Sequence, residues 1–137
     1  MEIFFNKEGV DTEVKEKKRI KKWIEETINH EGKKGETINI ILTSKKNIRS
    51  LNKKYMKRNY MTDIIAFNYN RDDFISGDLF INPDTIKKNA EEYKTTFSEE
   101  ILRVIIHGVL HLIGYNDKSV EEKIEMREKE NFYMDRF

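Results

Sequence analysis

The chain contains no cysteine, which excludes both a disulfide framework and a thiolate metal site. Any metal that it binds must therefore use nitrogen and oxygen ligands. The N-terminal segment lacks the basic start and long apolar run of a signal peptide, and no later segment has the length needed to cross a bilayer. These absences are typical of a reducing compartment, and we expect a cytoplasmic protein with no membrane partner.

The chain is also too short for several hydrophobic cores. Its 137 residues are 37% hydrophobic and 37% charged, so we expect residues 1–137 to form a single domain. It contains no internal repeat, low-complexity tract or interdomain linker. The mixture of strand and helix patterns predicts the α+β class, with one sheet covered by helices.

Apolar periodicity predicts where these elements lie. The expected strands are residues 2–5, 38–42, 63–67 and 78–82, and the expected helices lie around residues 20–28, 44–54, 83–93, 98–113 and 119–133. We expect Tyr55 and Tyr93 on buried helix faces, and residues 68–77 as an exposed polar loop. Residues 101–113 are almost continuously apolar, which predicts a helix through the centre of the protein.

The net charge of +1 conceals a basic segment in the middle of the chain. Its basic residues, with no acidic residue among them, are Lys45, Lys46, Arg49, Lys53, Lys54, Lys57 and Arg58. Such a segment can bind the phosphates of a nucleic acid, but basic runs also occur as solvated surface. Charge alone leaves both interpretations open. After Asp117, acids and bases alternate as they do on a solvated helix face.

Residues 105–118, IIHGVLHLIGYNDK, carry the strongest indication of chemistry. His107 and His111 are four residues apart, so both imidazoles lie on one helix face and can reach a single ion. Gly114 can end the helix in a left-handed conformation and turn the chain back, so that Asp117 approaches the same point. Three protein ligands leave one position open on zinc, as in catalytic rather than structural sites.

Two histidines four residues apart also occur by chance. The alternative is that one is buried and hydrogen-bonded, both are ordinary helix residues, and Gly114 only ends the helix. The metal site is favoured because these are two of only three histidines, in a strongly apolar helix that a glycine and a carboxylate follow. Burying two unpaired imidazoles would be costly. His30 lacks such support, and we expect it at the surface.

The residue after the first histidine argues against proteolysis. Zinc proteases with the HExxH motif have their general-base glutamate at this position, and this chain has Gly108. The spacing from His107 through Gly114 to Asp117 still matches the longer zinc-protease pattern, in which a third ligand follows a glycine. A shared scaffold without shared chemistry is therefore expected.

HGVLHLIGYND resembles the motif of the YbeY family, bacterial metal-dependent endoribonucleases involved in the maturation of ribosomal RNA. The resemblance covers roughly residues 45–120, where LNKKY (51–55), TDIIAF (62–67), SGDLFIN (76–82) and the helix and turn of residues 99–117 occur in the order and spacing of that family. It implies a mixed sheet of about four strands with helices around it, a zinc site open to a cleft, and RNA as the substrate.

The chain departs from the family pattern at two positions. The family usually has histidine as its third ligand, where this chain has Asp117, which can bind zinc but should weaken its Lewis acidity. The family generally has arginine directly after the tyrosine of LNxxY, where this chain has Met56. Arg58, two residues on, could instead stabilise charge on the phosphate and is our candidate catalytic residue.

We therefore expect hydrolysis of a single-stranded RNA phosphodiester, with one zinc ion polarising a phosphoryl oxygen or activating water. DNA is not expected as a partner. No general base is evident, since Asp63, Asp78, Asn52 and Thr62 are more simply explained as turn or loop anchors. Two alternatives are a non-catalytic, RNA-binding ribosome-assembly factor with a structural metal and, less favoured, a zinc peptidase.

Overall fold

Strands and helices occur close to where the apolar periodicity predicts them, within residues 1–56 and 62–137, which the computed structural model describes. The strands are β1 (Glu2–Glu8), β2 (Lys34–Thr43), β3 (Ile64–Asn68) and β4 (Phe74–Ile81). The helices are α1 (Lys17–His30), α2 (Lys45–Tyr55), α3 (Pro83–Glu92), α4 (Phe97–Ile113) and α5 (Val120–Met134). Among these described helices, none is long and apolar enough to span a membrane.

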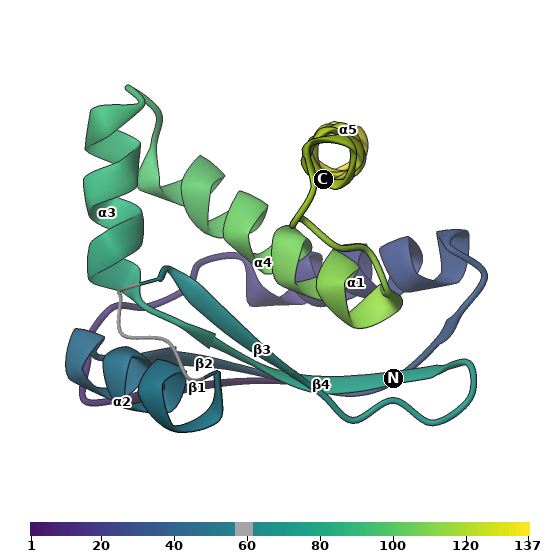
Figure 1. The fold of residues 1–137 in the computed structure, drawn as a ribbon, viewed down its shortest axis with the longest axis horizontal. Coiled ribbons are helices and arrows are strands. Elements are labelled where there is room, and N and C mark those ends of the chain that lie inside the picture. Colours follow the sequence, from purple (N-terminus) through teal and green to yellow (C-terminus); the bar gives the residue numbers. More distant parts are fainter. Residues whose placement is uncertain (57–61) are drawn as a thin grey trace.

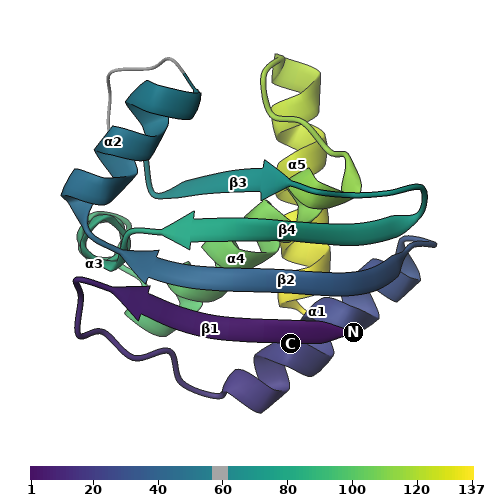
Figure 2. The ribbon, with the colours of Figure 1, turned by 90° about the horizontal axis from the view of Figure 1, so that it is seen from below.

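The strands form one mixed sheet in the order β1-β2-β4-β3. The pairs β1–β2 and β2–β4 are parallel, whereas β3 runs antiparallel to β4 and forms an edge of the sheet. Helices α1, α4 and α5 lie on one side of this sheet (Figure 1). Figure 2 looks onto the opposite side, which α2 borders at one end. The predicted α+β class with a four-stranded mixed sheet is confirmed.

Helix α4 packs directly on the sheet, as its apolar sequence predicts. Its buried residues are Ile101, Val104, Ile105, Ile106, Gly108, Val109, Leu110 and Leu112. Two glycines allow the close approach: a Cβ added at Gly108 would lie 2.6 Å from Cδ1 of Ile64, and one added at Gly77 would lie 2.7 Å from Cδ2 of Leu112. The histidine-bearing helix is thereby fixed against β3 and β4.

Side-chain caps define where several helices begin. Ser44 is the N-cap of α2 and Asn82 that of α3, since both side chains accept a backbone N–H three residues on. Helix α4 begins earlier than predicted, because Thr96 rather than Ser98 is its N-cap. The Thr96 hydroxyl accepts the backbone N–H of Glu99 at 3.1 Å.

The predicted burial of two tyrosines is wrong. Tyr55 and Tyr93 are 54% and 66% exposed. Both come at the C-terminal end of a helix, Tyr55 as the last residue of α2 and Tyr93 as the C-cap of α3, where the helical spacing no longer directs a side chain into the core. In α2 the buried positions belong to Ile48 and Asn52.

The predicted loop at residues 68–77 is also too long, because β4 begins at Phe74. Ile75 and Gly77 are buried while Phe74 and Ser76 lie on the other face, which is the alternation of a strand. The polar residues of this segment concealed the pattern. Ser76 lies on the sheet face that the central helix does not cover, whereas the side chains of Asn68 and Asn70 reach the end of that helix.

Candidate metal centre

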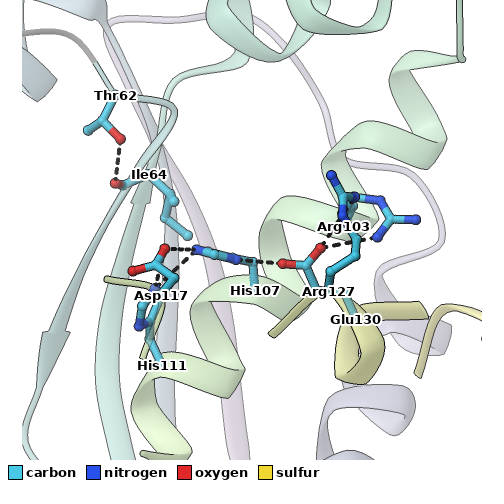
Figure 3. Close-up of polar contacts among 8 residues, drawn as sticks. All are labelled: Thr62, Ile64, Arg103, His107, His111, Asp117, Arg127 and Glu130. Atoms are coloured by element: carbon cyan, nitrogen blue, oxygen red, sulfur yellow. Dashed lines mark hydrogen bonds and ion pairs between the residues drawn. The ribbon is translucent and has the colours of Figure 1, made fainter. Parts of the chain in front are cut away.

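Three side chains with metal-ligand chemistry converge at the C-terminal end of α4. Nε2 of His107 and Nε2 of His111 lie 3.0 Å apart, and Oδ2 of Asp117 lies 3.3 Å from each of them. Figure 3 shows Asp117 reaching the two imidazoles from the loop that follows the helix. The structure thus brings together the three residues that the sequence predicts.

The local fold explains this convergence. Gly114 ends α4 with a φ of 128°, which residues with a side chain rarely adopt. The backbone N–H of Tyr115 then donates to the carbonyl of Leu110 at 3.0 Å, so the chain folds back over the last turn. The Asn70 side chain also donates to the Leu112 carbonyl at 2.7 Å, which ties this helix end to the β3–β4 connection.

The spacing of the three atoms fits one divalent ion. Ligands bound to zinc at about 2.0 Å in a tetrahedron are about 3.3 Å apart, close to the separations seen here. Two imidazole nitrogens and one carboxylate oxygen are a donor set that zinc accepts. The Asp117 side chain is 41% exposed, so the cluster is open to solvent on that side. His107, His111 and Asp117 can therefore hold a metal ion with a position left for a further ligand.

Glu130 of α5 holds the other side of the His107 ring. Its Oε2 accepts a hydrogen bond from Nδ1 of His107 at 2.6 Å, and its side chain is only 7% exposed. Arg103 donates to Oε1 at 3.1 Å, and a nitrogen of Arg127 lies 3.7 Å from the same oxygen (Figure 3). An Nδ1–H donated to a carboxylate leaves Nε2 with its lone pair available and fixes the ring orientation, as metal-binding histidines require.

Glu130 is not predicted from the sequence, because the alternating acids and bases after Asp117 indicate a solvated helix face. A signal was present. Met126, Glu130 and Tyr133 are separated by four and three residues, and all three are buried. A glutamate at such a core position of a helix requires a charged or hydrogen-bonding partner elsewhere in the fold.

Burial and neighbouring charges shift the pKa values of the site in different directions. Burial disfavours the His107 imidazolium, but the hydrogen bond and charge of Glu130 outweigh it, so the pKa of His107 lies above its ordinary value. Burial and the charge of His107 lower the pKa of His111. Burial raises the pKa of Glu130, but its hydrogen bond to His107 prevails and the net shift is downward. In the metal-free chain, His107 is therefore the imidazole that more readily holds a proton.

A cleft of about 520 Å³ opens beside the three side chains, between α2, β3 and the loop after α4. Met56, at the position where the family generally has arginine, lines this cleft, as do Asn116 and Lys118. A second hollow of about 440 Å³ also reaches His107 and Asp117. Its lining includes Arg103, Lys123 and Arg127. Substrate groups could thus approach the ion from two sides.

The polar residues considered as general bases separate into two groups. Asn52, Thr62 and Asp63 line the cleft, and Asn52 is buried. The Thr62 hydroxyl donates to the Ile64 carbonyl at 3.3 Å. Burial raises the pKa of Asp63. Asp78 instead lies on the opposite sheet face, where it accepts a hydrogen bond from Asn39 at 2.9 Å. Asp78 is therefore not part of this site.

The described basic residues of α2 are all exposed, namely Lys45, Lys46, Arg49, Lys53 and Lys54. Helix α2 borders the cleft through Asn52 and Met56, while none of the five described cations lines it. The basic helix is therefore a neighbour of the cleft rather than its wall. Lys57 and Arg58 lie outside the described residues.

Gly108 leaves no room for the glutamate of a zinc protease. A Cβ at this position would lie 2.6 Å from Cδ1 of Ile64 and 2.9 Å from Cδ2 of Leu79. The close packing of α4 on the sheet thus accounts for glycine here. The peptidase alternative loses both its catalytic residue and the space for one.

The fold and the site define a class of small α+β proteins in which a buried helix carries two histidines of an open metal site. A model of the family described as endoribonuclease YbeY matches residues 4–137. The chain belongs to the YbeY family of metal-dependent endoribonucleases, which confirms the resemblance.

Individual relatives match over nearly the whole chain. Endoribonuclease YbeY of Parabacteroides distasonis is 42% identical over 131 residues, which cover 96% of this chain and 92% of the relative. The protein of the same name from Chloroherpeton thalassium is 40% identical over 134 residues, covering 98% and 94%. The solution structure of TM1509 from Thermotoga maritima superposes with a TM-score of 0.67 at 31% identity, covering 97% of this chain and 87% of that one.

Proposed function

We propose that this chain is a single-strand-directed endoribonuclease that uses one zinc ion and acts in the maturation of ribosomal RNA in the cytoplasm. The observation that carries the proposal is the triangle of His107, His111 and Asp117 at the mouth of a cleft, in a member of a family of endoribonucleases. Residues 1–137 would act together as one hydrolase domain.

The proposed roles of the ligand residues follow from their geometry. Zinc, when bound, supplies Lewis-acid chemistry for attack on a phosphodiester. His107 and His111 would hold the ion from the helix, and the hydrogen bond from His107 to Glu130 keeps Nε2 of His107 directed toward His111 and Asp117. Asp117 closes the triangle from the loop, and its negative charge makes the site less electrophilic than a third histidine would.

The proposed roles of the cations differ. The exposed basic residues of α2, together with Lys57, would hold the RNA backbone, because phosphate contacts supply most of the affinity for nucleic acids. Met56 lines the cleft but carries no charge. We propose that Arg58 supplies the charge that stabilises the phosphate in the transition state.

The test combines metal content with cleavage. Protein purified without added metal should contain up to one zinc per chain by elemental analysis, and should cleave an unpaired RNA but neither its duplex nor the DNA of the same sequence. A chelator should abolish cleavage and zinc should restore it, while His111→Ala should bind no metal. Cleavage that persists in the His111→Ala protein would contradict the proposal. RNA binding without any metal-dependent cleavage would instead favour an assembly factor with a structural metal.

A further inference from the structure

Figure 2 looks onto the sheet face that α2 borders. Four aromatic side chains lie together on this face, next to residues that line the metal cleft. Tyr55 at the end of α2 and Tyr69 just after β3 are 54% and 57% exposed. Phe67 of β3 and Phe80 of β4 lie partly buried on the same face. The ring of Phe67 is 5.4 Å from that of Tyr55 and 5.8 Å from that of Phe80, both edge to face. We call these four residues the aromatic face.

Strand alternation and register fix the direction of these rings. Ile64 of β3 points toward α4, so Phe67, three residues on, points to the opposite side. Phe67 pairs with Asp78 in the register of β3 and β4, which places it near Phe80, two residues further along. The β3–β4 pairing extends to Tyr69, because its backbone N–H donates to the Ser76 carbonyl at 2.9 Å. Tyr69, two residues after Phe67, therefore points to the same side of the sheet.

The aromatic face has no part in holding the metal or packing the core. The helices of the hydrophobic core cover the other side of the sheet (Figure 1). Exposed aromatic rings that lie together on a surface mark a binding site more often than scattered ones do. The two exposed tyrosines therefore indicate a binding site.

Two observations indicate what that ligand is. The face continues into the metal cleft around the edge strand, because Met56, next to Tyr55, and Asn68, next to Phe67, both line the cleft. A cation also accompanies the rings: Nζ of Lys54 lies 5.2 Å from the ring centroid of Tyr55, at the end of the basic helix. Aromatic rings beside a basic track are how proteins bind unpaired nucleic acid without sequence preference.

We propose that the aromatic face stacks the bases of single-stranded RNA whose backbone passes around the β3 edge into the metal cleft. This inference rests on the proposed function and deepens it. Every unpaired base has an open π-face, whereas a duplex hides these faces, so stacking here selects for unpaired RNA and tolerates any sequence. Tyr55 and Tyr69 supply the accessible rings, and Phe67 and Phe80 support them.

The test measures binding of a 2′-O-methyl oligonucleotide, which resists cleavage and carries the fluorescent base 2-aminopurine, to the zinc-loaded protein. Tyr55→Leu and Tyr69→Leu should each weaken binding about 5- to 10-fold and reduce the quenching that stacking causes. The salt dependence of binding should stay unchanged, because no phosphate contact is lost. Tyr55→Phe and Tyr69→Phe keep the ring and should bind like the unaltered protein. Phe132→Leu, which removes an exposed ring from α5, is the matched control.

Three outcomes would overturn the stacking proposal. Wild-type affinity and quenching in both leucine variants would show that the rings touch no base. A flatter salt dependence in those variants would show that they disturb phosphate binding instead. A dimer detected by sedimentation velocity and dissociated by Tyr55→Leu would assign the face to a second copy of the chain. If the unaltered protein neither binds nor cleaves unpaired RNA, the proposed function fails as well, which the cleavage assay distinguishes.

Discussion

His107 is held from two sides that differ in almost every physical respect. On its Nε2 side, the mouth of the site, His111 and Asp117 face a cleft, and Asp117 is 41% exposed. On its Nδ1 side, the back of the site, Glu130 is 7% exposed and two arginines compensate its charge. A buried carboxylate needs such partners, whereas an exposed one can rely on water. The mouth is thus built to bind and exchange ligands, and the back to fix one ring.

Glu31, the C-cap residue of α1, joins the two sides. Its carboxylate accepts hydrogen bonds from the hydroxyl of Tyr115, in the loop that leads to Asp117, and from that of Tyr133, on the helix that carries Glu130. Lys129 also donates to it at 3.2 Å. Glu31, at the C-terminal end of α1, is therefore hydrogen-bonded to residues of both the mouth and the back, and we call it the shared anchor.

Removing a ligand at the mouth should have the largest effect. His111→Ala leaves two of three ligands, so we expect loss of bound zinc and a fall in RNA cleavage of about 10³-fold, the equivalent of several kcal/mol of charge stabilisation. The melting temperature of the metal-free protein should change little, because His111 makes no contact with the back of the site among the described residues. Metal analysis, cleavage assays and calorimetry of the same samples measure all three quantities. A variant that keeps its zinc would disprove this ligand assignment.

Substitution of Glu130, at the back of the site, should have a smaller effect, which is a weaker affinity for zinc. Glu130→Gln keeps the size of the side chain but weakens the partner of His107 Nδ1, so zinc affinity should fall about 10- to 100-fold. Glu128→Gln, an exposed glutamate two residues away on α5, is the matched control and should leave affinity unchanged. Competition with a zinc-binding dye gives the dissociation constants. If both variants bind zinc equally well, the back has no part in positioning the ring.

The shared anchor predicts a dependence of stability on pH. Burial raises the pKa of Glu31, but the hydrogen bonds from Tyr115, Tyr133 and Lys129 outweigh it and lower the pKa below its ordinary value. Its contribution to stability is therefore present above about pH 4.5 and is lost as the pH falls through the lowered pKa. Glu31→Gln should cost about 1–2 kcal/mol in the free energy of unfolding at pH 7 and less at pH 3, which is below the ordinary pKa of glutamate.

Urea unfolding of the metal-free protein at the two pH values measures this difference. Glu91→Gln, an exposed glutamate on α3, should show no such dependence and serves as the control. An equal loss at both pH values would mean that packing rather than charge makes the anchor.

The same contrast explains how much of the site the sequence could predict. The mouth lies within eleven consecutive residues, 107–117, where helical spacing and one glycine determine the geometry. The back depends on a contact between residues 23 apart, which no local pattern specifies. In the fold, the positions of the strands followed from apolar alternation, whereas the exposure of Tyr55 and Tyr93 depended on where the core ends. The start of β4 was concealed by polar residues. Local spacing predicts local geometry, and tertiary packing decides the rest.

Substitution of a single basic residue should have the smallest effect, which is a change in the salt dependence of RNA binding. This effect should differ between residues on the cleft side of the site and those at its back. Lys118 lines the cleft and Lys53 is exposed on α2, so Lys118→Gln and Lys53→Gln should each reduce the slope of log affinity against log salt concentration by about 0.7. Arg127 lies at the back of the site, 3.7 Å from Glu130, and away from the path along α2 that we propose for the RNA backbone, so Arg127→Gln should leave the slope unchanged. Titrations of an unpaired RNA at several salt concentrations measure these slopes. A flatter slope in Arg127→Gln than in Lys53→Gln would place the RNA backbone along α5 and not along α2.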